Sequence, residues 1–123
     1  MEKETTISTL HQLLDYNTQH FIVGEVHLQQ ALKNWIEKAS AVKLKAIFQK
    51  YLEHIDHNVK SFEKFIDMER MNLISSEHKI LTTLIEDADK TYLYCSDPEI
   101  KDASLLASVQ VINHFKICAY GTA

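Results

Sequence analysis

The sequence predicts an all-α protein: an antiparallel bundle of four helices that forms a single domain over residues 1–123. The chain has only two glycines and one proline, whereas sheet proteins and loop-rich proteins need many more of both for their turns. Apolar residues make up 46% of the chain, enough to bury a core. They recur at alternating spacings of three and four, which places them along one face of each helix.

The first helix is expected over residues 5–37, where the apolar stripe persists without a break. Gly24 falls inside this stripe. A glycine there weakens the helix by about 1 kcal/mol but also lets a neighbouring helix approach closely. The stripe includes Ile7, Leu14, Phe21, Leu28 and Trp35.

The second helix is expected over residues 41–69, after the short connection Lys38–Ser40. Because this connection is so short, the first two helices should form an antiparallel hairpin. The third helix is expected over residues 76–94, with Ser75 or Ser76 as its N-cap.

The fourth helix is expected over residues 98–120, and its start is the clearest boundary in the chain. Asp97 is a good N-cap, and Pro98 suits the first helical position, where its missing N–H is not needed. This helix is apolar nearly all round. Four helices cannot cover it on every side, so another chain or another helix must cover its outer face, and we expect a homodimer.

Charge and composition exclude several classes of protein. The net charge is −4 with no basic patch, so no nucleic-acid partner is expected. No apolar run reaches the roughly 18 residues of a membrane span, so no membrane association is expected either. The polar start lacks a signal peptide, and Cys95 and Cys118 are widely separated. We therefore expect a cytoplasmic protein with reduced thiols.

Several polar residues fall on or near the inward faces of these helices. Glu25 borders the apolar stripe of the first helix, and His54 and Asn58 lean inward from the second. Lys116 lies on the same side as the apolar stripe of the fourth helix, the most unusual placement in the chain, with Asn113 one turn before it. We predict that these five residues form a polar pocket in the bundle core.

The segment Glu53–Asn58 looks like a dense ligand cluster but divides between two faces of its helix. While His54 and Asn58 lean inward, Glu53, Asp56 and His57 should face water. His114 should likewise point away from Lys116.

At this point the residues carry a resemblance to a known family. The chain resembles, over nearly its whole length, the bacterial stress-associated ferritin-like family represented by YciE and YciF. Its most specific part is the C-terminal run, which is similar to the family's Asp-Pro, Asp-Ala, Glu-His-Tyr-Glu and Ala-Tyr-Gly-Thr pattern. The segments that carry the resemblance are Gly24–Leu28, Leu44–Phe48, Tyr51–His54, Val59–Glu63 and Asp97–Ala123.

The resemblance implies a ferritin-like bundle that is often dimeric, and a di-metal centre by analogy with ferritin-like proteins. The departures matter more than the matches. His54 stands in place of a family glutamate, and Asn113 and Lys116 replace both glutamates of the Glu-His-Tyr-Glu pattern. Thr82 takes an acidic position. We therefore predict that Lys116 pairs with Glu25 and replaces the charge of a metal.

The leading functional prediction is a degenerate ferritin-like protein, non-catalytic and without metal or other cofactor, with a structural or stress-related interaction role. One alternative is a di-metal or mononuclear protein that binds iron, manganese or zinc through Glu25, His54 and Asp89. A second is a histidine phosphotransfer module that uses His57, with Lys60 three residues later and Ser61 where a glycine is usual.

Overall fold

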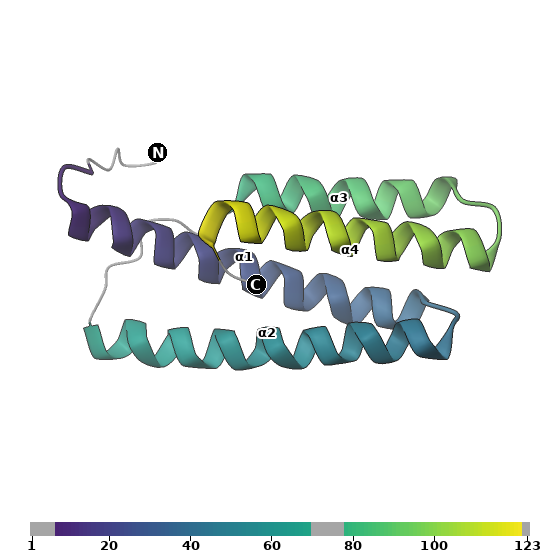
Figure 1. Ribbon diagram of the computed structural model, residues 1–123, viewed down its shortest axis with the longest axis horizontal. Helices are drawn as coiled ribbons and strands as arrows, with labels where there is room; N and C mark the ends of the chain where they lie inside the picture. Colours follow the sequence, from purple (N-terminus) through teal and green to yellow (C-terminus); the bar gives the residue numbers. More distant parts are fainter. Residues whose placement is uncertain (1–6, 70–77, 122–123) are drawn as a thin grey trace.

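The computed structural model describes residues 7–69 and 78–121, without the side chains of 65–69. The described part consists of four helices with the connections at residues 39–41 and 95–97 (Figure 1). The all-α four-helix architecture is therefore confirmed. The helices are α1 (Leu10–Lys38), α2 (Val42–Glu69), α3 (Lys79–Tyr94) and α4 (Pro98–Tyr120).

Local capping chemistry sets the helix starts. The predicted start of the first helix, at residue 5, is wrong. The helix begins at Leu10, because Thr9 is the N-cap of α1. Its hydroxyl accepts from the backbone N–H of Gln12, and the Gln12 side chain accepts from the backbone of Thr9 in return. At α4 the prediction holds: Asp97 accepts from Ile100 N at 2.9 Å. The helix ends at Tyr120, and its C-cap is Gly121, whose φ of 66° suits glycine.

The start of α3 differs from the predicted one. The predicted caps, Ser75 and Ser76, lie outside the described residues. Within them the N-cap is His78, whose ring Nδ1 accepts from Leu81 N at 3.2 Å. Histidine is not among the preferred N-cap residues, so a contact elsewhere must hold this ring in place.

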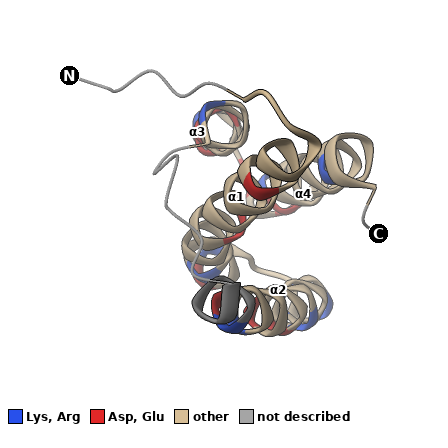
Figure 2. Cartoon of the chain, turned by 90° about the vertical axis from the view of Figure 1, so that its left-hand side faces the viewer, with Lys and Arg blue, Asp and Glu red and all other residues tan. Residues whose placement is uncertain are grey.

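The helices are arranged around α1. It packs against α2, α3 and α4, and α3 pairs with α4 in a second hairpin. Figure 2 shows α1 between α2 on one side and the α3–α4 pair on the other. Because α2 packs extensively only against α1 among the described residues, a groove is left between α2 and α4.

The core lies where α1 meets its neighbours. Its large, fully buried apolar side chains are Leu28, Leu32, Trp35, Phe48, Ile55, Leu81, Leu105 and Ile112. The outer face of α4 remains uncovered, as its sequence predicts: Ile100, Val111 and Ile117 are each at least 40% exposed. Within residues 7–69 and 78–121, none of the helices carries an apolar stretch of the length and hydropathy that a bilayer span requires.

One carboxylate ties the two hairpins together. Asp102 of α4 accepts from the backbone N–H groups of Ser40 and Ala41, both at 2.8 Å. The first turn of α2 has no acidic residue of its own. Asp102 therefore supplies, from another helix, the negative charge that a helix N-terminus favours.

Candidate functional site

A buried ion pair lies in the middle of the bundle. Lys116 Nζ of α4 lies 2.6 Å from Glu25 Oε1 of α1, and the two side chains are only 6% and 1% exposed. The predicted pairing is therefore present. Two charges out of water need each other and further hydrogen bonds, since either one alone would be strongly destabilising.

Residues of α2 and α4 complete this cluster. Asn58 Nδ2 donates to the other carboxylate oxygen of Glu25 at 3.3 Å. Lys116 Nζ donates to the hydroxyl of Tyr51 at 3.2 Å, and that hydroxyl lies 3.5 Å from Asn113 Oδ1, at the limit of a hydrogen bond. The predicted pocket thus holds Glu25, Asn58, Asn113 and Lys116, with Tyr51 as a member that the sequence prediction missed. We refer to these five residues as the ion-pair cluster.

The electrostatics of the ion-pair cluster favour a fixed arrangement. Burial, with a smaller contribution from the Glu25 carboxylate, raises the pKa of Tyr51 well above its ordinary value. Tyr51 therefore keeps its proton, accepts from Lys116 and donates toward Asn113. The ammonium of Lys116 also lies 5.2 Å from the ring centroid of Tyr51, within cation–π range.

The structure corrects the predicted place of His54, which is exposed and outside the ion-pair cluster. It lies at the edge of an open groove of about 370 Å³ between α2 and α4, whose lining also includes Tyr51 and Asn113. Among the described residues α2 packs extensively only against α1, so the buried face of α2 is narrow and does not include His54.

The alternative metal ligands do not come together. His54 is exposed, and the carboxylate of Asp89 accepts from the indole N–H of Trp35 at 2.7 Å. Glu25 is already occupied by the Lys116 ammonium and the Asn58 amide. Across the described part of the chain, no three His, Cys, Asp or Glu side chains gather as a metal site requires. These residues do not fit a di-metal centre.

The remaining predicted positions divide between solvent and protein. Glu53, His57 and His114 are exposed, as predicted. Exposure of His57 suits both a solvated residue and a phosphotransfer histidine, so the phosphotransfer role stays a prediction. Asp56 was expected to face water but is half-buried, and its carboxylate accepts from the side-chain amide of Gln29 at 2.6 Å.

Sequence reasoning missed a second cluster, called here the histidine–tyrosine cluster, which consists of the buried His78 and the half-buried His20 and Tyr120. The hydroxyl of Tyr120 lies 2.6 Å from His78 Nε2 and 3.2 Å from His20 Nδ1. The two imidazole rings stack with centroids 3.8 Å apart and an interplanar angle of 12°. Nearly parallel rings cannot aim their in-plane lone pairs at one metal ion, so the arrangement suits hydrogen bonding rather than metal binding.

Gly24 is the one sequence signal that pointed to this region. A Cβ at Gly24 would lie 2.9 Å from both His78 Cδ2 and Leu81 Cδ2. The predicted close approach of a neighbouring helix at Gly24 is therefore confirmed, and the neighbour is α3. This contact holds the His78 ring at the start of α3, where it serves as the N-cap.

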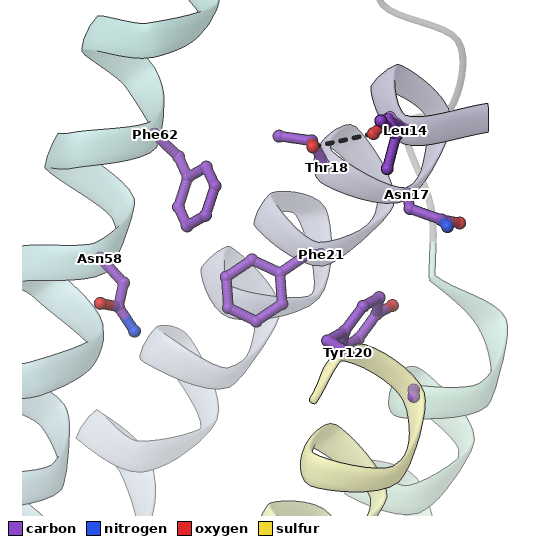
Figure 3. Close-up of a pocket in the computed structure, with 8 residues that line it drawn as sticks. Leu14, Asn17, Thr18, Phe21, Asn58, Phe62 and Tyr120 are labelled. Atoms are coloured by element: carbon purple, nitrogen blue, oxygen red, sulfur yellow. Dashed lines mark hydrogen bonds between the residues drawn. The ribbon is translucent and has the colours of Figure 1, made fainter. Parts of the chain in front are cut away.

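An open cavity of about 350 Å³ adjoins both clusters at this end of the bundle. Figure 3 shows Phe21 of α1, Phe62 of α2 and Tyr120 of α4 around it. The rings of Phe21 and Phe62 are 5.1 Å apart, and those of Phe21 and Tyr120 are 5.0 Å apart. Its lining residues are Leu14, Asn17, Thr18, Phe21, Asn58, Phe62, Ala119 and Tyr120.

Comparison with known proteins agrees with this fold. The chain is 28% identical over 105 residues to protein YciF of Escherichia coli (strain K12), a match that covers 80% of this chain and 60% of YciF. In structure it is similar to YcfI from Rhodopseudomonas palustris, with a TM-score of 0.87, 23% identity, and coverage of 97% of this chain and 76% of YcfI. The predicted resemblance to the YciE and YciF proteins is thus confirmed. Residues 9–123 match a domain of unknown function, DUF892, and the chain therefore belongs to the DUF892 family.

Proposed function

We propose that this protein is a non-catalytic, ferritin-like bundle in which the Lys116 ammonium stands in place of metal ions, and that its role is structural or stress-related interaction. The observation that carries the proposal is the buried Glu25–Lys116 ion pair, with its 2.6 Å contact. An internal cation at that position neutralises the inward carboxylate without a bound metal.

Charge balance supports this proposal. A di-metal bundle offers a carboxylate from each of two helices and a Glu-x-x-His pair from each of the other two. Here Glu25 is the one acid in the ion-pair cluster, and it already faces a cation. A second positive charge close to Lys116 would be repelled strongly in a buried site.

The proposed interaction surface is the outer face of α4, where a second copy would dock in a homodimer. Val111 is 54% exposed, Ile100 is 52% exposed and Ile117 is 40% exposed along this helix. The partner helix would cover apolar surface that the described helices leave open. A cytoplasmic location belongs to this proposal, as does the stress association of the family that the chain resembles.

Metal analysis tests the first part. The full-length wild type and the Lys116→Met variant are expressed with added iron, manganese and zinc and purified without chelator. The metal content of both proteins is then measured by mass spectrometry. The wild type should hold well below one metal ion per chain and, on addition of ferrous iron, should consume oxygen no faster than a protein-free control. Near-stoichiometric metal that Glu25→Gln removes would overturn the proposal.

Light scattering on a sizing column tests the second part. We expect a dimer for the wild type and a monomer for Val111→Asp. Leu10→Asp is the matched control, because Leu10 is 71% exposed and belongs to the first turn of α1. A wild-type monomer at micromolar concentration, or equal loss of the dimer in both variants, would contradict docking through α4.

A further inference from the structure

The hydrogen bonds of the histidine–tyrosine cluster run in one direction. His78 Nδ1 accepts from the backbone N–H of Leu81, so neutral His78 must carry its proton on Nε2. That proton is donated to the Tyr120 hydroxyl at 2.6 Å. The hydroxyl can then donate to His20 Nδ1 at 3.2 Å. The chain of donors therefore runs from Leu81 of α3 through Tyr120 of α4 to His20 of α1.

We propose that His20, His78 and Tyr120 form an acid-released latch, which holds the start of α3 and the end of α4 on α1 and opens when the histidines take up protons. A proton added to His78 must go to Nδ1, the atom that caps α3, and this removes the acceptor of Leu81 N–H. A proton added to His20 Nδ1 removes the acceptor of the Tyr120 hydroxyl in the same way. Two imidazolium rings stacked at 3.8 Å would also repel each other.

The surroundings offer little to stabilise these charges. The titratable side chains that face the latch from its surroundings are Tyr16, His27 and Glu25, all on α1. The carboxylate of Glu25 is already engaged by Lys116 and Asn58. Phe115 packs edge-on against the His78 ring, 5.7 Å between centroids.

Burial and the neighbouring rings favour the neutral forms. Burial lowers the pKa of His20, and burial followed by the nearby His20 lowers the pKa of His78 to about 4. Since the ordinary pKa of histidine is 6.5, the unfolded chain binds more protons than the folded chain between these values. The stability contributed by the latch is therefore complete above pH 6.5 and is lost as the pH falls to about 4.

Opening should be local. His78 and Tyr120 lie at the ends of α3 and α4, whereas Trp35, Phe48 and Asp102 hold the other end of the bundle. The α1–α2 hairpin contributes only His20 to the latch. Acid is thus expected to loosen the first turns of α3 and the last turns of α4 while the α1–α2 hairpin stays protected.

Urea unfolding of the full chain at pH 7 and pH 5 tests the latch. His78→Asn keeps an N-cap acceptor but removes the titrating ring, and His57→Gln removes an exposed histidine of α2. For each protein we compare the folding equilibrium constant at pH 7 with that at pH 5. The decrease should be at least about tenfold larger for the wild type and for His57→Gln than for His78→Asn. An equal fall in all three proteins would overturn the proposal.

Two further measurements keep the proposal testable if His78→Asn does not fold. Hydrogen-exchange protection factors of the wild type should drop at pH 5 near residues 79–84 and 115–120, and a uniform drop across all four helices would contradict the latch. In an NMR titration the His78 ring should stay neutral down to pH 5. Titration of that ring near its ordinary pKa would overturn the proposal as well.

Discussion

The ion-pair cluster and the histidine–tyrosine cluster are both built on α1, yet they bury ionisable groups in opposite ways. The first holds a full positive and a full negative charge in contact, at 2.6 Å. The second holds two imidazole rings neutral and links them through one hydroxyl. A buried pair of charges is sensitive to loss of either partner, whereas a buried neutral pair is sensitive to the gain of a proton. The two clusters should therefore respond to different perturbations.

The largest effect is expected from Lys116→Met, which leaves the Glu25 carboxylate buried without its cation. We expect a loss of about 3–5 kcal/mol in the free energy of unfolding, measured by urea denaturation at pH 7. The double variant Glu25→Gln with Lys116→Met should recover much of this loss, because no charge then remains buried. A single variant that costs less than about 1 kcal/mol would show that Glu25 has other partners.

Gly24→Ala tests the close packing beneath the histidine–tyrosine cluster. At an open helical position this change would stabilise by about 1 kcal/mol. Here the new methyl group would lie 2.9 Å from His78 and Leu81 side-chain carbons, so we expect a net loss of about 1–2 kcal/mol. Gln30→Ala, on the exposed face of the same helix, is the control in thermal unfolding. Stabilisation by Gly24→Ala would mean that α3 moves away at little cost.

Tyr51→Phe separates the role of the hydroxyl from that of the ring in the ion-pair cluster. The hydroxyl accepts from Lys116, and its removal should cost about 1 kcal/mol in the free energy of unfolding. In a Lys116→Met background the same change should cost much less, since the donor is gone. Equal costs in the two backgrounds would remove Tyr51 from the cluster.

The smallest effect is expected from His54→Ala, because this exposed side chain lies outside both clusters. The free energy of unfolding should change by less than about 0.5 kcal/mol. A loss of more than about 1 kcal/mol in urea denaturation would place His54 in the ion-pair cluster after all.

Local patterns predicted the fold well. The shortage of glycine and proline and the apolar stripes predict four helices, and Asp97 and Pro98 predict the start of α4 at the observed residue. The pairing of Glu25 with Lys116 was predicted from an inward glutamate and an inward lysine together with the resemblance to the ferritin-like family, in which both positions are metal positions. The number of helices and the start of α4 depend on patterns within single helices, which can be read directly from the sequence.

The misses depend on contacts between helices. His54 and Tyr51 are three residues apart on α2, and which of them is buried is decided by the open groove toward α4. His20 and Tyr120 are 100 residues apart in the chain, so no local pattern brings them together. The N-cap role of His78 likewise requires the close approach that Gly24 allows.

The bonds from Asp102 to Ser40 and Ala41 also bear on where the chain tolerates added residues. Both residues are exposed and form a short surface connection, the kind of place chosen for inserting a tag or a second domain. Yet their backbone N–H groups are fixed at 2.8 Å to a carboxylate on another helix. An insertion between Ser40 and Ala41 would therefore separate the two hairpins, and the exposure of these two residues alone misjudges the connection as permissive.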